Sequence, residues 1–493
     1  MVEDIDIRPD RYYDSIRLMQ ATAAMRAVDG VEDAVAVMAG PAGRGFLADL
    51  GFVLDDAGAG PGDLVVAVRC RDEAARAAAH QALADNLSGT GAGAAILSGG
   101  GGLGQVRPHT VSSAARMRRA DIALISVPGE HAFVEAMDAL RAGLHVMLFS
   151  DNLSVDEEVM LKHEARRRDR LVMGPDCGTA IVGGVGLGFA NAVELGPVSL
   201  VGASGTGIQQ LCCLLDSAGV GVRHALGTGG RDLSAEVGGV STLQALAALD
   251  RDPGTELIAL VSKPPDPEVA ARIEAAARDA ATPVVTAFLG TAERTLEDAA
   301  CELVRTLARI QGGEAAAPSF PFVTASAQPR PGTLRGLFAG GSLCAEARAL
   351  VAAALGADPV EISDHTGDGP VLIDYGADAF TRGRGHPMID QRVRLDRMAA
   401  AIDDPAVGVL LLDVVLGYGA HPDPASELAP VVARATGRGL AVVVSLCGTE
   451  RDPQGRARQE EVLHRAGASV FASNAAAARH AASLIEPTSE EAQ

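Results

Sequence analysis

The feature that most limits the fold of this chain is an order of elements that occurs twice in its second half. Residues 195–312 contain an apolar strand, a turn of small residues and a helix ("PVSLVGASGTGIQQL"), then an Asp-Pro pair, a buried strand, a proline-rich turn and a last strand ending in glycine. Residues 333–487 repeat this order, from "LRGLFAGGSLCAEARAL" to "AVVVSLCG". Repetition of a whole supersecondary unit indicates duplication. The pattern predicts two tandem flavodoxin-like domains, joined by a Pro/Ala-rich linker at 313–332.

The preceding segments also read as α/β structure. Residues 107–194 alternate near-continuous apolar strands with amphipathic helices, which indicates a parallel, Rossmann-like sheet. Residues 1–87 predict a small α/β module with a βαββαβ-like order, of the ferredoxin-like kind. Residues 88–106 are glycine-rich without periodicity, which favours a mobile loop or linker over the alternative of a phosphate-binding loop.

Charge and composition exclude several classes of protein. The formal net charge of −21 argues against nucleic acid or an anionic membrane as the main partner. The apolar runs are strand-length and the acidic amino terminus lacks a signal-peptide core, so we expect a cytoplasmic protein without a membrane span. The 7 cysteines have no metal-type spacing, and the histidines lack HxxxH or HExxH spacing. We therefore expect reduced thiols and no metal site.

Both duplicated domains place a small-residue turn between a strand and a helix. The turn residues are Ser204, Gly205 and Thr206 in the first copy and Gly340, Gly341 and Ser342 in the second. Free amides and the helix dipole make such a turn favourable for phosphate or carboxylate, and glycine lets the anion approach the backbone. One such turn often serves packing alone, whereas two equivalent turns could face one anion from opposite sides. The sequence therefore predicts a shared anion site.

Further polar residues fall in turns where strands are expected to end. "HALGTGGRDLS" contains Gly229 and Arg231, "VSKPPDP" contains Lys263, and "GRGHPMID" contains His386. Lys263 is one of only two lysines, with Lys162, in a chain whose basic residues are otherwise arginine, which suggests that its compact ammonium is needed. For each of these residues the alternative is ordinary turn stabilisation.

At this point the residues resemble a known family. "ADIALISVPGEHAFVEAMDALRAGLHVMLFSDNLSVDEEVMLKHEARRRDRLVMGPDCGTA" is similar to the CoA-binding domain of the succinyl-CoA synthetase α subunit, and "SLVGASGTG" with "GTGGRD" to its ligase domain. "GLAVVVSLCGTERDPQGRARQEEVLHRAGASVF" resembles the carboxyl end of the β subunit. With "YYDSIRLM", "GRGHPMID" and "ALGTGGRDLS", nearly the whole chain resembles the FdrA family. The resemblance implies a CoA-binding-type domain at 107–194, with cofactor positions at Pro128, Asp176 and Cys177, and two ligase-type domains.

The departures from succinyl-CoA synthetase concern its chemistry. After the strand matching "VVTAFLG" the chain reads "TAERTLEDAACELV", without the histidine that the synthetase phosphorylates. An ATP-grasp domain is absent, and no glycine-rich CoA turn is recognisable before residue 110. The parts that activate a carboxylate with ATP are therefore missing from this chain.

The FdrA resemblance implies a subunit of an oxamate carbamoyltransferase of allantoin breakdown, acting on carbamoyl phosphate with companion subunits. It requires no cofactor in that reading, and CoA is the one optional cofactor. In that reading Lys263 contacts the phosphate, Arg231 holds the acceptor's carboxylate, and His386, titrating near neutral pH, exchanges a proton with the amide nitrogen. The alternatives are a CoA-dependent acyl transferase or acyl-CoA synthetase component, and a non-catalytic subunit that binds phosphate or CoA. A homo- or hetero-oligomer is expected in each case.

Overall fold

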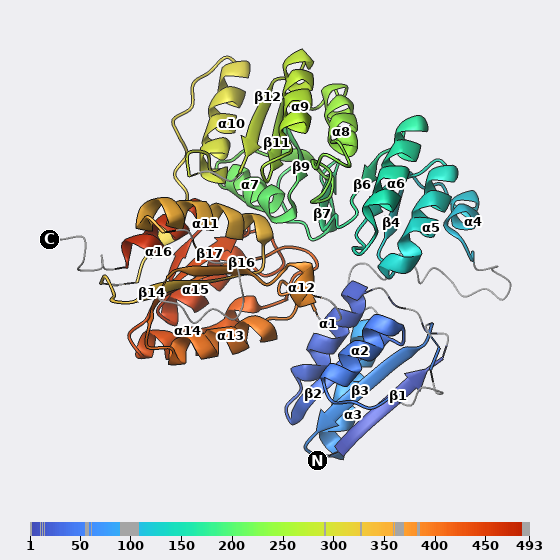
Figure 1. The fold of residues 1–493 in the computed structure, drawn as a ribbon, viewed down its shortest axis with the longest axis vertical. Helices are drawn as coiled ribbons and strands as arrows, with labels where there is room; N and C mark the ends of the chain where they lie inside the picture. The colour runs from blue at the N-terminus through green and yellow to red at the C-terminus, as the bar shows by residue number, and fades with distance from the viewer. Residues whose placement is uncertain are drawn as a thin grey trace.

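The computed structural model describes residues 2–485, except residues 10, 12, 14, 55–58, 61, 89–107, 290–291, 326–327, 358, 360–368 and 382–384. These residues form α/β domains that follow one another along the chain (Figure 1). Beyond Ser88, the glycine-rich segment expected at 88–106 lies outside the described residues.

The N-terminal module is an antiparallel sheet, of order β1-β3-β2, covered by helices on both faces. Its elements are β1 (Val2–Arg8), α1 (Ser15–Arg26), β2 (Val31–Met38), α2 (Pro41–Asp49), β3 (Leu64–Cys70) and α3 (Glu73–Ser88). Along β3, Val66 and Val68 face α1 and α3, whereas Val65 and Ala67 face α2, as the two-residue period of a strand requires. The observed order βαβαβα differs from the expected βαββαβ-like order. The first strand, β1, was not predicted because four of the seven residues of "VEDIDIR" are charged and the strand lies at a sheet edge.

The next domain is a three-stranded parallel sheet of order β4-β5-β6. Its elements are α4 (Val111–Met117), β4 (Ile122–Ile125), α5 (Gly129–Arg141), β5 (His145–Leu148), α6 (Val155–Arg167) and β6 (Val172–Met173). A capping box in which Ser154 and Glu157 bond to each other's backbone starts α6. This three-stranded sheet confirms the parallel α/β pattern expected for this part of the chain.

The first ligase-type domain has a six-stranded sheet of order β12-β11-β9-β10-β7-β8. Its elements are β7 (Thr179–Val182), β8 (Val185–Gly188), β9 (Val198–Ala203), α7 (Gly205–Ser217), β10 (Val222–Gly227), α8 (Val240–Asp250), β11 (Leu257–Ser262), α9 (Pro267–Asp279), β12 (Val284–Phe288) and α10 (Leu296–Ile310). The β7–β8 hairpin pairs with β10, so the expected boundary at residue 194 falls too late.

The second ligase-type domain has a sheet of order β13-β18-β17-β16-β14-β15. Its elements are β13 (Phe322–Val323), β14 (Thr333–Phe338), α11 (Gly341–Leu355), β15 (Val371–Asp374), α12 (Asp378–Thr381), α13 (Arg392–Asp403), β16 (Val407–Val415), α14 (Pro424–Gly437), β17 (Ala441–Cys447), α15 (Arg456–Arg465), β18 (Ser469–Phe471) and α16 (Asn474–Ser483). The expected linker at 313–332 is not wholly irregular, because it contributes the edge strand β13.

The two ligase-type domains share one connectivity. Counted from β9, the parallel strands of the first lie in the order 2-1-3-4, and counted from β14 those of the second lie in the order 2-1-3-4-5, which is the flavodoxin-like order. Helices α7 and α11 follow the first strand in each and pack against each other in a core common to both domains. The same order and the same role of these helices agree with a duplication.

Candidate functional site

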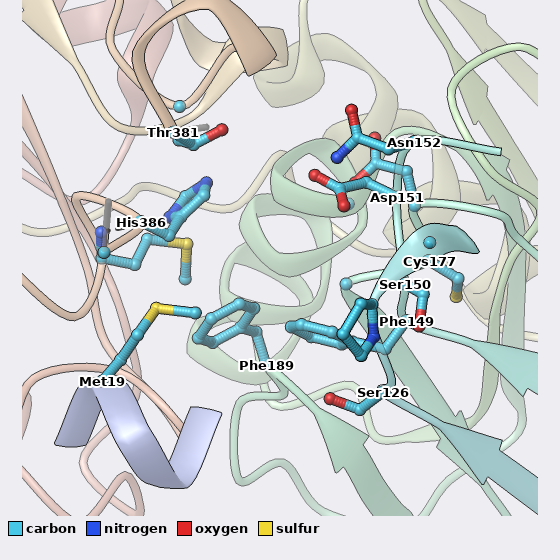
Figure 2. A pocket seen from close by; sticks show the side chains of 18 of the residues that line it. Met19, Ser126, Phe149, Ser150, Asp151, Asn152, Cys177, Phe189, Thr381 and His386 are labelled. Carbon is cyan, nitrogen blue, oxygen red and sulfur yellow. Dashed lines mark hydrogen bonds between the residues drawn. The ribbon is translucent and has the colours of Figure 1, made fainter. Parts of the chain in front are cut away.

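A cavity of about 1320 Å³ lies where the four domains meet, and every domain contributes to its lining (Figure 2). The ligase-type domains supply the two predicted turns, the Rossmann-like domain supplies residues that follow β4 and β5, and the N-terminal module supplies α1. The carboxyl ends of parallel strands thus point into the cavity, as in other α/β proteins. Most of the predicted site residues lie here.

The two predicted turns touch each other inside this cavity. Ser204 caps α7 by accepting a hydrogen bond from the Gly207 amide at 3.1 Å, and its Oγ donates to Ser342 Oγ at 2.5 Å. A methyl group added to Gly340 would lie 2.8 Å from Thr206. The amino ends of α7 and α11 therefore meet, so their dipoles and first-turn amides concentrate positive potential at one place.

A buried ion pair fixes the turn before α11. Asp413, on β16, accepts hydrogen bonds from the amides of Ala339 (2.7 Å) and Gly340 (2.8 Å), and Arg394 donates to the same carboxylate at 2.6 Å. Burial raises the pKa of Asp413, and the neighbouring Arg394 opposes this shift. Because the Gly340 amide already donates to Asp413, this glycine shapes the turn and the amides available to an anion begin at Gly341.

Lys263 and an unpredicted carboxylate flank the start of α11. A methyl group added to Gly341 would lie 3.2 Å from Lys263 Nζ and 2.5 Å from Asp374 Oδ2. Lys263 follows β11, and Asp374 ends β15, where its Oδ1 accepts from the Gly376 amide at 2.9 Å. The short run "VLID" followed by tyrosine and glycine was the available sequence signal for this strand end.

His386 points into the cavity as a neutral imidazole. Its Nδ1 accepts from the Met388 amide at 3.2 Å, which assigns the ring hydrogen to Nε2. Burial, and then the positive charge of Arg394, lower the pKa of His386 to about 4. The expectation of an imidazole titrating near pH 7 is therefore wrong, and at neutral pH His386 is a hydrogen-bond donor through Nε2.

The wall opposite His386 combines aromatic and polar groups. Phe149 and Phe189 lie between the two sides, with ring centroids 5.5 Å apart, and Asp151 and Asn152 point into the cavity from the segment after β5 (Figure 2). None of these residues was predicted, since only the assembled domains bring them opposite His386.

The predicted cofactor positions lie on this side of the cavity. Pro128 precedes the first turn of α5, and Asp176 has a left-handed φ of 55°. Cys177 donates from Sγ to the Gly227 carbonyl at 3.3 Å, and burial raises its pKa to about 12. Gly229 (φ +88°) also lines the cavity, and a methyl group there would lie 2.3 Å from the Pro175 carbonyl oxygen. Cys177 and Gly229 therefore serve close packing, and Cys177 is a protonated thiol.

Arg231 does not line the cavity, contrary to expectation. Its Nε donates to Glu158 at 3.0 Å and its NH2 to the Leu153 carbonyl at 3.0 Å, which directs the guanidinium into the junction with α6. The other lysine, Lys162, lies fully buried in the same junction, 2.7 Å from both Glu158 and Asp232. This part of the predicted site is a domain contact.

The described residues contain neither a metal-binding cluster nor a helix that could span a membrane. Within those ranges, no group of three or more His, Cys, Asp or Glu side chains could hold a metal ion. No described helix combines the length and the apolar character that crossing a membrane requires.

Three protein families match parts of this chain. The CoA-ligase family matches residues 337–484, the CoA binding domain family matches residues 193–290, and the AllF, heavy metal-associated domain family matches residues 1–99. The CoA-binding match thus covers the first ligase-type domain, whereas a CoA-binding-type domain was expected at 107–194.

Similar proteins include one that aligns along nearly the whole chain. "Uncharacterized protein YahF" of Escherichia coli is 36% identical over 515 residues, which cover 95% of this chain and 96% of that protein. Subunit alpha 1 of the ADP-forming succinate–CoA ligase of Archaeoglobus fulgidus is 28% identical over 159 residues, which cover 31% of this chain and 53% of that subunit.

Among solved structures, the dinucleotide-forming acetyl-coenzyme A synthetase 1 of Ca. Korarchaeum cryptofilum covers 78% of this chain and 85% of its own, at 15% identity and a TM-score of 0.32. The ATP citrate lyase of Methanothrix soehngenii covers 43% of this chain and 44% of its own, at 18% identity and a TM-score of 0.35.

Proposed function

The chain belongs to the FdrA/AllF-like family of succinyl-CoA-synthetase-like proteins, and we propose that it transfers an activated carbonyl group between a phosphate and an acceptor. The observation that carries this proposal is the meeting of the α7 and α11 amino ends beside Lys263. Helix starts of this kind bind phosphate through backbone amides, and an ammonium adds a full positive charge.

In such a transfer the acceptor attacks the carbonyl carbon of an acyl phosphate. A new bond forms between the carbonyl carbon and the acceptor, the bond from that carbon to the phosphate oxygen breaks, and phosphate leaves with the electron pair. Donors that face the leaving phosphate stabilise the charge that develops on it. We assign this part to the amides of Gly205 and Gly341 and to Lys263.

His386 is assigned a second role, at the carbonyl group. A neutral imidazole with its hydrogen on Nε2 can donate to a carbonyl oxygen as that oxygen becomes negative. It is also the wrong form for storing a phosphoryl group through Nδ1, because that nitrogen accepts from the Met388 amide. The protein is thus proposed to start from an acyl phosphate, a mixed anhydride whose carbonyl group is already activated.

The first candidate acceptor is the thiol of CoA, which would make the chain an acyl-CoA synthetase-like component. The matches to CoA-ligase and CoA binding domain families support this reading. Among the described residues, however, the cavity lining offers only two full cations, Arg26 and Lys263, and Arg26 is already held by Asp33 and Asp390. This lining does not fit the several phosphates of a whole CoA molecule.

The second candidate reaction is carbamoyl transfer, with carbamoyl phosphate as the donor. The charge of the cavity lining favours this reaction. Carbamoyl phosphate has one phosphate, which fits the single positive region at the helix starts. Its amide hydrogens need acceptors, and Asp151 and Asn152 offer oxygens opposite His386 (Figure 2). The AllF name of the family matched by residues 1–99 agrees with nitrogen release from allantoin. We propose companion subunits and a cytoplasmic oligomer as the setting of either reaction.

Calorimetric titration of the purified chain with inorganic phosphate, acetyl phosphate, carbamoyl phosphate and CoA tests these assignments. We expect saturable phosphate binding that both acyl phosphates displace. Tight CoA binding would select the acyl-CoA reading, and carbamoyl phosphate binding without CoA binding would select carbamoyl transfer. A chain that binds none of the phosphates would contradict the proposed function.

A further inference from the structure

The N-terminal module matches a family described as heavy metal-associated, but its residues do not fit a metal. Soft metals are usually held by cysteine thiolates. Residues 1–99 contain a single cysteine, Cys70, which lies buried on β3, and burial raises its pKa. No described residue group can supply three ligands. The module must therefore contribute something else to the protein.

What the module contributes is a wall of the cavity. Met19, Thr22 and Arg26 of α1 line it, and Met19 points toward Phe189 and the neighbourhood of His386 (Figure 2). The module thus touches the same space as the helix starts, although more than 100 residues of chain separate α1 from α7 (from Arg26 to Gly205).

A closed ring of four alternating charges joins the module to the second ligase-type domain. Arg26 lies 3.0 Å from Asp390 and 3.0 Å from Asp33, and Arg392 lies 3.1 Å from Asp33 and 3.0 Å from Asp390. Each guanidinium therefore bridges two carboxylates, one from each domain. The ring is electrically neutral, so it does not supply charge to a bound anion.

The ring is joined to His386 by one turn of backbone. The amide of Asp390 donates to the His386 carbonyl at 3.0 Å, as does the amide of Ile389 at 2.8 Å. The amide of Met388, within this turn, holds the imidazole Nδ1. A displacement of Asp390 would therefore move the atoms that fix the ring's direction and its hydrogen.

We propose that the N-terminal module is a positioning element, in which Arg26 and Asp33, through Asp390 and Arg392, hold the 386–390 turn so that His386 Nε2 faces the cavity. Arg26 and Asp33 are positioning residues and touch no reacting atom in this assignment. This proposal rests on the proposed function only for the role of His386 as a hydrogen-bond donor to the substrate's carbonyl oxygen.

Arginine is the side chain that this arrangement requires. A planar guanidinium has donors on both sides and can bridge two carboxylates at once, whereas an ammonium is a compact charge without that geometry. Arg26→Lys should therefore keep the charge but hold the turn only in part, and Arg26→Ala should release it.

The experiment follows the His386 imidazole by NMR in the full chain labelled with ¹⁵N-histidine, with the signal assigned by its loss in His386→Asn. In the unsubstituted chain we expect a neutral ring, with hydrogen on Nε2, that resists protonation. In Arg26→Ala and Arg392→Ala the midpoint of its titration should rise by about one unit or more toward that of a free histidine. Arg71→Ala, which removes an exposed arginine of the same module, is the matched control and should leave the signal unchanged.

An unchanged His386 signal in both ring variants would overturn the proposal, and so would an equal change in Arg71→Ala. If Arg26→Ala does not fold, Arg26→Lys must show the same shift in smaller measure. Titration of the same variants with inorganic phosphate keeps the two proposals separate: the ring does not contact the helix starts, so phosphate affinity should stay within about twofold. Stoichiometric binding of Cu⁺ or Zn²⁺ that Cys70→Ser abolishes would reinstate a metal role for the module and contradict its assignment here.

Discussion

Ser204 Oγ lies 2.5 Å from Ser342 Oγ, so two serines that are 138 positions apart in the chain join the starts of two helices. The α7 and α11 amino ends are thereby held at one place in the cavity. Two aligned sets of backbone amides form a stronger anion site than either helix alone, because each contributes its own partial positive charge.

Replacement of Lys263 by methionine should weaken the binding of inorganic phosphate by about ten- to hundredfold, since a hydrogen bond to a charged group contributes roughly 1.5–3 kcal/mol. Methionine keeps much of the side-chain length without the charge. Arg278→Ala, an exposed arginine on α9 outside the cavity lining, is the control. Equal phosphate affinities by calorimetry in the two variants would show that Lys263 does not contact the anion.

Removal of the negative charge of Asp374 should strengthen phosphate binding. Its Oδ2 lies beside the start of α11, where it repels an incoming anion, and Asp374→Asn keeps an oxygen for the Gly376 amide. The gain should be about three- to tenfold at low salt, and smaller at high salt. Asp396→Asn, on α13, controls for the change in net charge. A loss of affinity in Asp374→Asn would mean that the carboxylate supports the ligand instead.

The two glycines at the helix starts should differ in their tolerance of alanine. A methyl group on Gly341 would lie 2.5 Å from Asp374 Oδ2, whereas one on Gly205 would meet Thr179 Oγ1 at an ordinary 3.6 Å. Gly341→Ala should therefore lower phosphate affinity by about tenfold or more, and Gly205→Ala by about threefold or less, because overpacking costs typically 1–3 kcal/mol. The opposite ranking would contradict the proposed geometry.

Buried Glu346 should make the protein less stable as pH rises. Burial raises its pKa to about 7 from 4.5, although Asn474 and the Leu296 amide donate to it at 2.7 and 2.6 Å. The folded state therefore binds the proton more tightly than the unfolded state. This contribution is fully present below about pH 4.5 and is lost by about pH 7, up to about 3 kcal/mol. Denaturation of Glu346→Gln should show a flatter pH dependence in this window, and exposed Glu274→Gln should not.

The contribution of His386 to stability should depend on pH in the opposite direction to that of Glu346, over an overlapping range of pH. Because its folded pKa is about 4 and its ordinary value is 6.5, the unfolded state binds the proton more readily. Stability is thus lost as pH falls from about 6.5 to about 4, by about 2–3 kcal/mol at most. His386→Asn keeps an acceptor for the Met388 amide and should remove this loss, as urea denaturation at pH 5 and pH 7 would show. An equal loss in the variant would place the acid sensitivity elsewhere.

The sequence revealed those parts of the fold that depend on local pattern. Apolar runs of strand length and the repeated small-residue turns predicted the parallel sheets and the two tandem domains, because burial on both faces leaves a continuous apolar signature. The strand β1 was not predicted, because an edge strand with charged residues lacks a continuous apolar run. Likewise β15, the strand that places Asp374, has only four residues.

Site residues could be predicted from the sequence only where they lie in one local turn at a strand end. Because the strand ends of an α/β sheet converge, the predicted turn residues do line the cavity. They are Ser204–Thr206, Gly341, Ser342, Lys263 and His386. Arg231 was misplaced because its sequence neighbourhood could not show that Glu158, on another domain, lies within 3.0 Å. The Arg26–Asp390 contact likewise joins residues 364 positions apart, which no local pattern reports.

The burial of Lys162 at the junction of α6 with the loop after β10 has a mechanical consequence. Parting these two domains would break the contacts of Lys162 with Asp232 (2.7 Å) and of Arg231 with Glu158 (3.0 Å), both of which cross the junction. We therefore expect the Rossmann-like domain and the first ligase-type domain to move as one rigid block. The N-terminal module is attached to the second ligase-type domain through the ring of four charges, in which Arg392 is the most exposed member, with 37% of its side chain accessible. Substrate would then enter the cavity when the N-terminal module moves aside, while the other domains keep their positions.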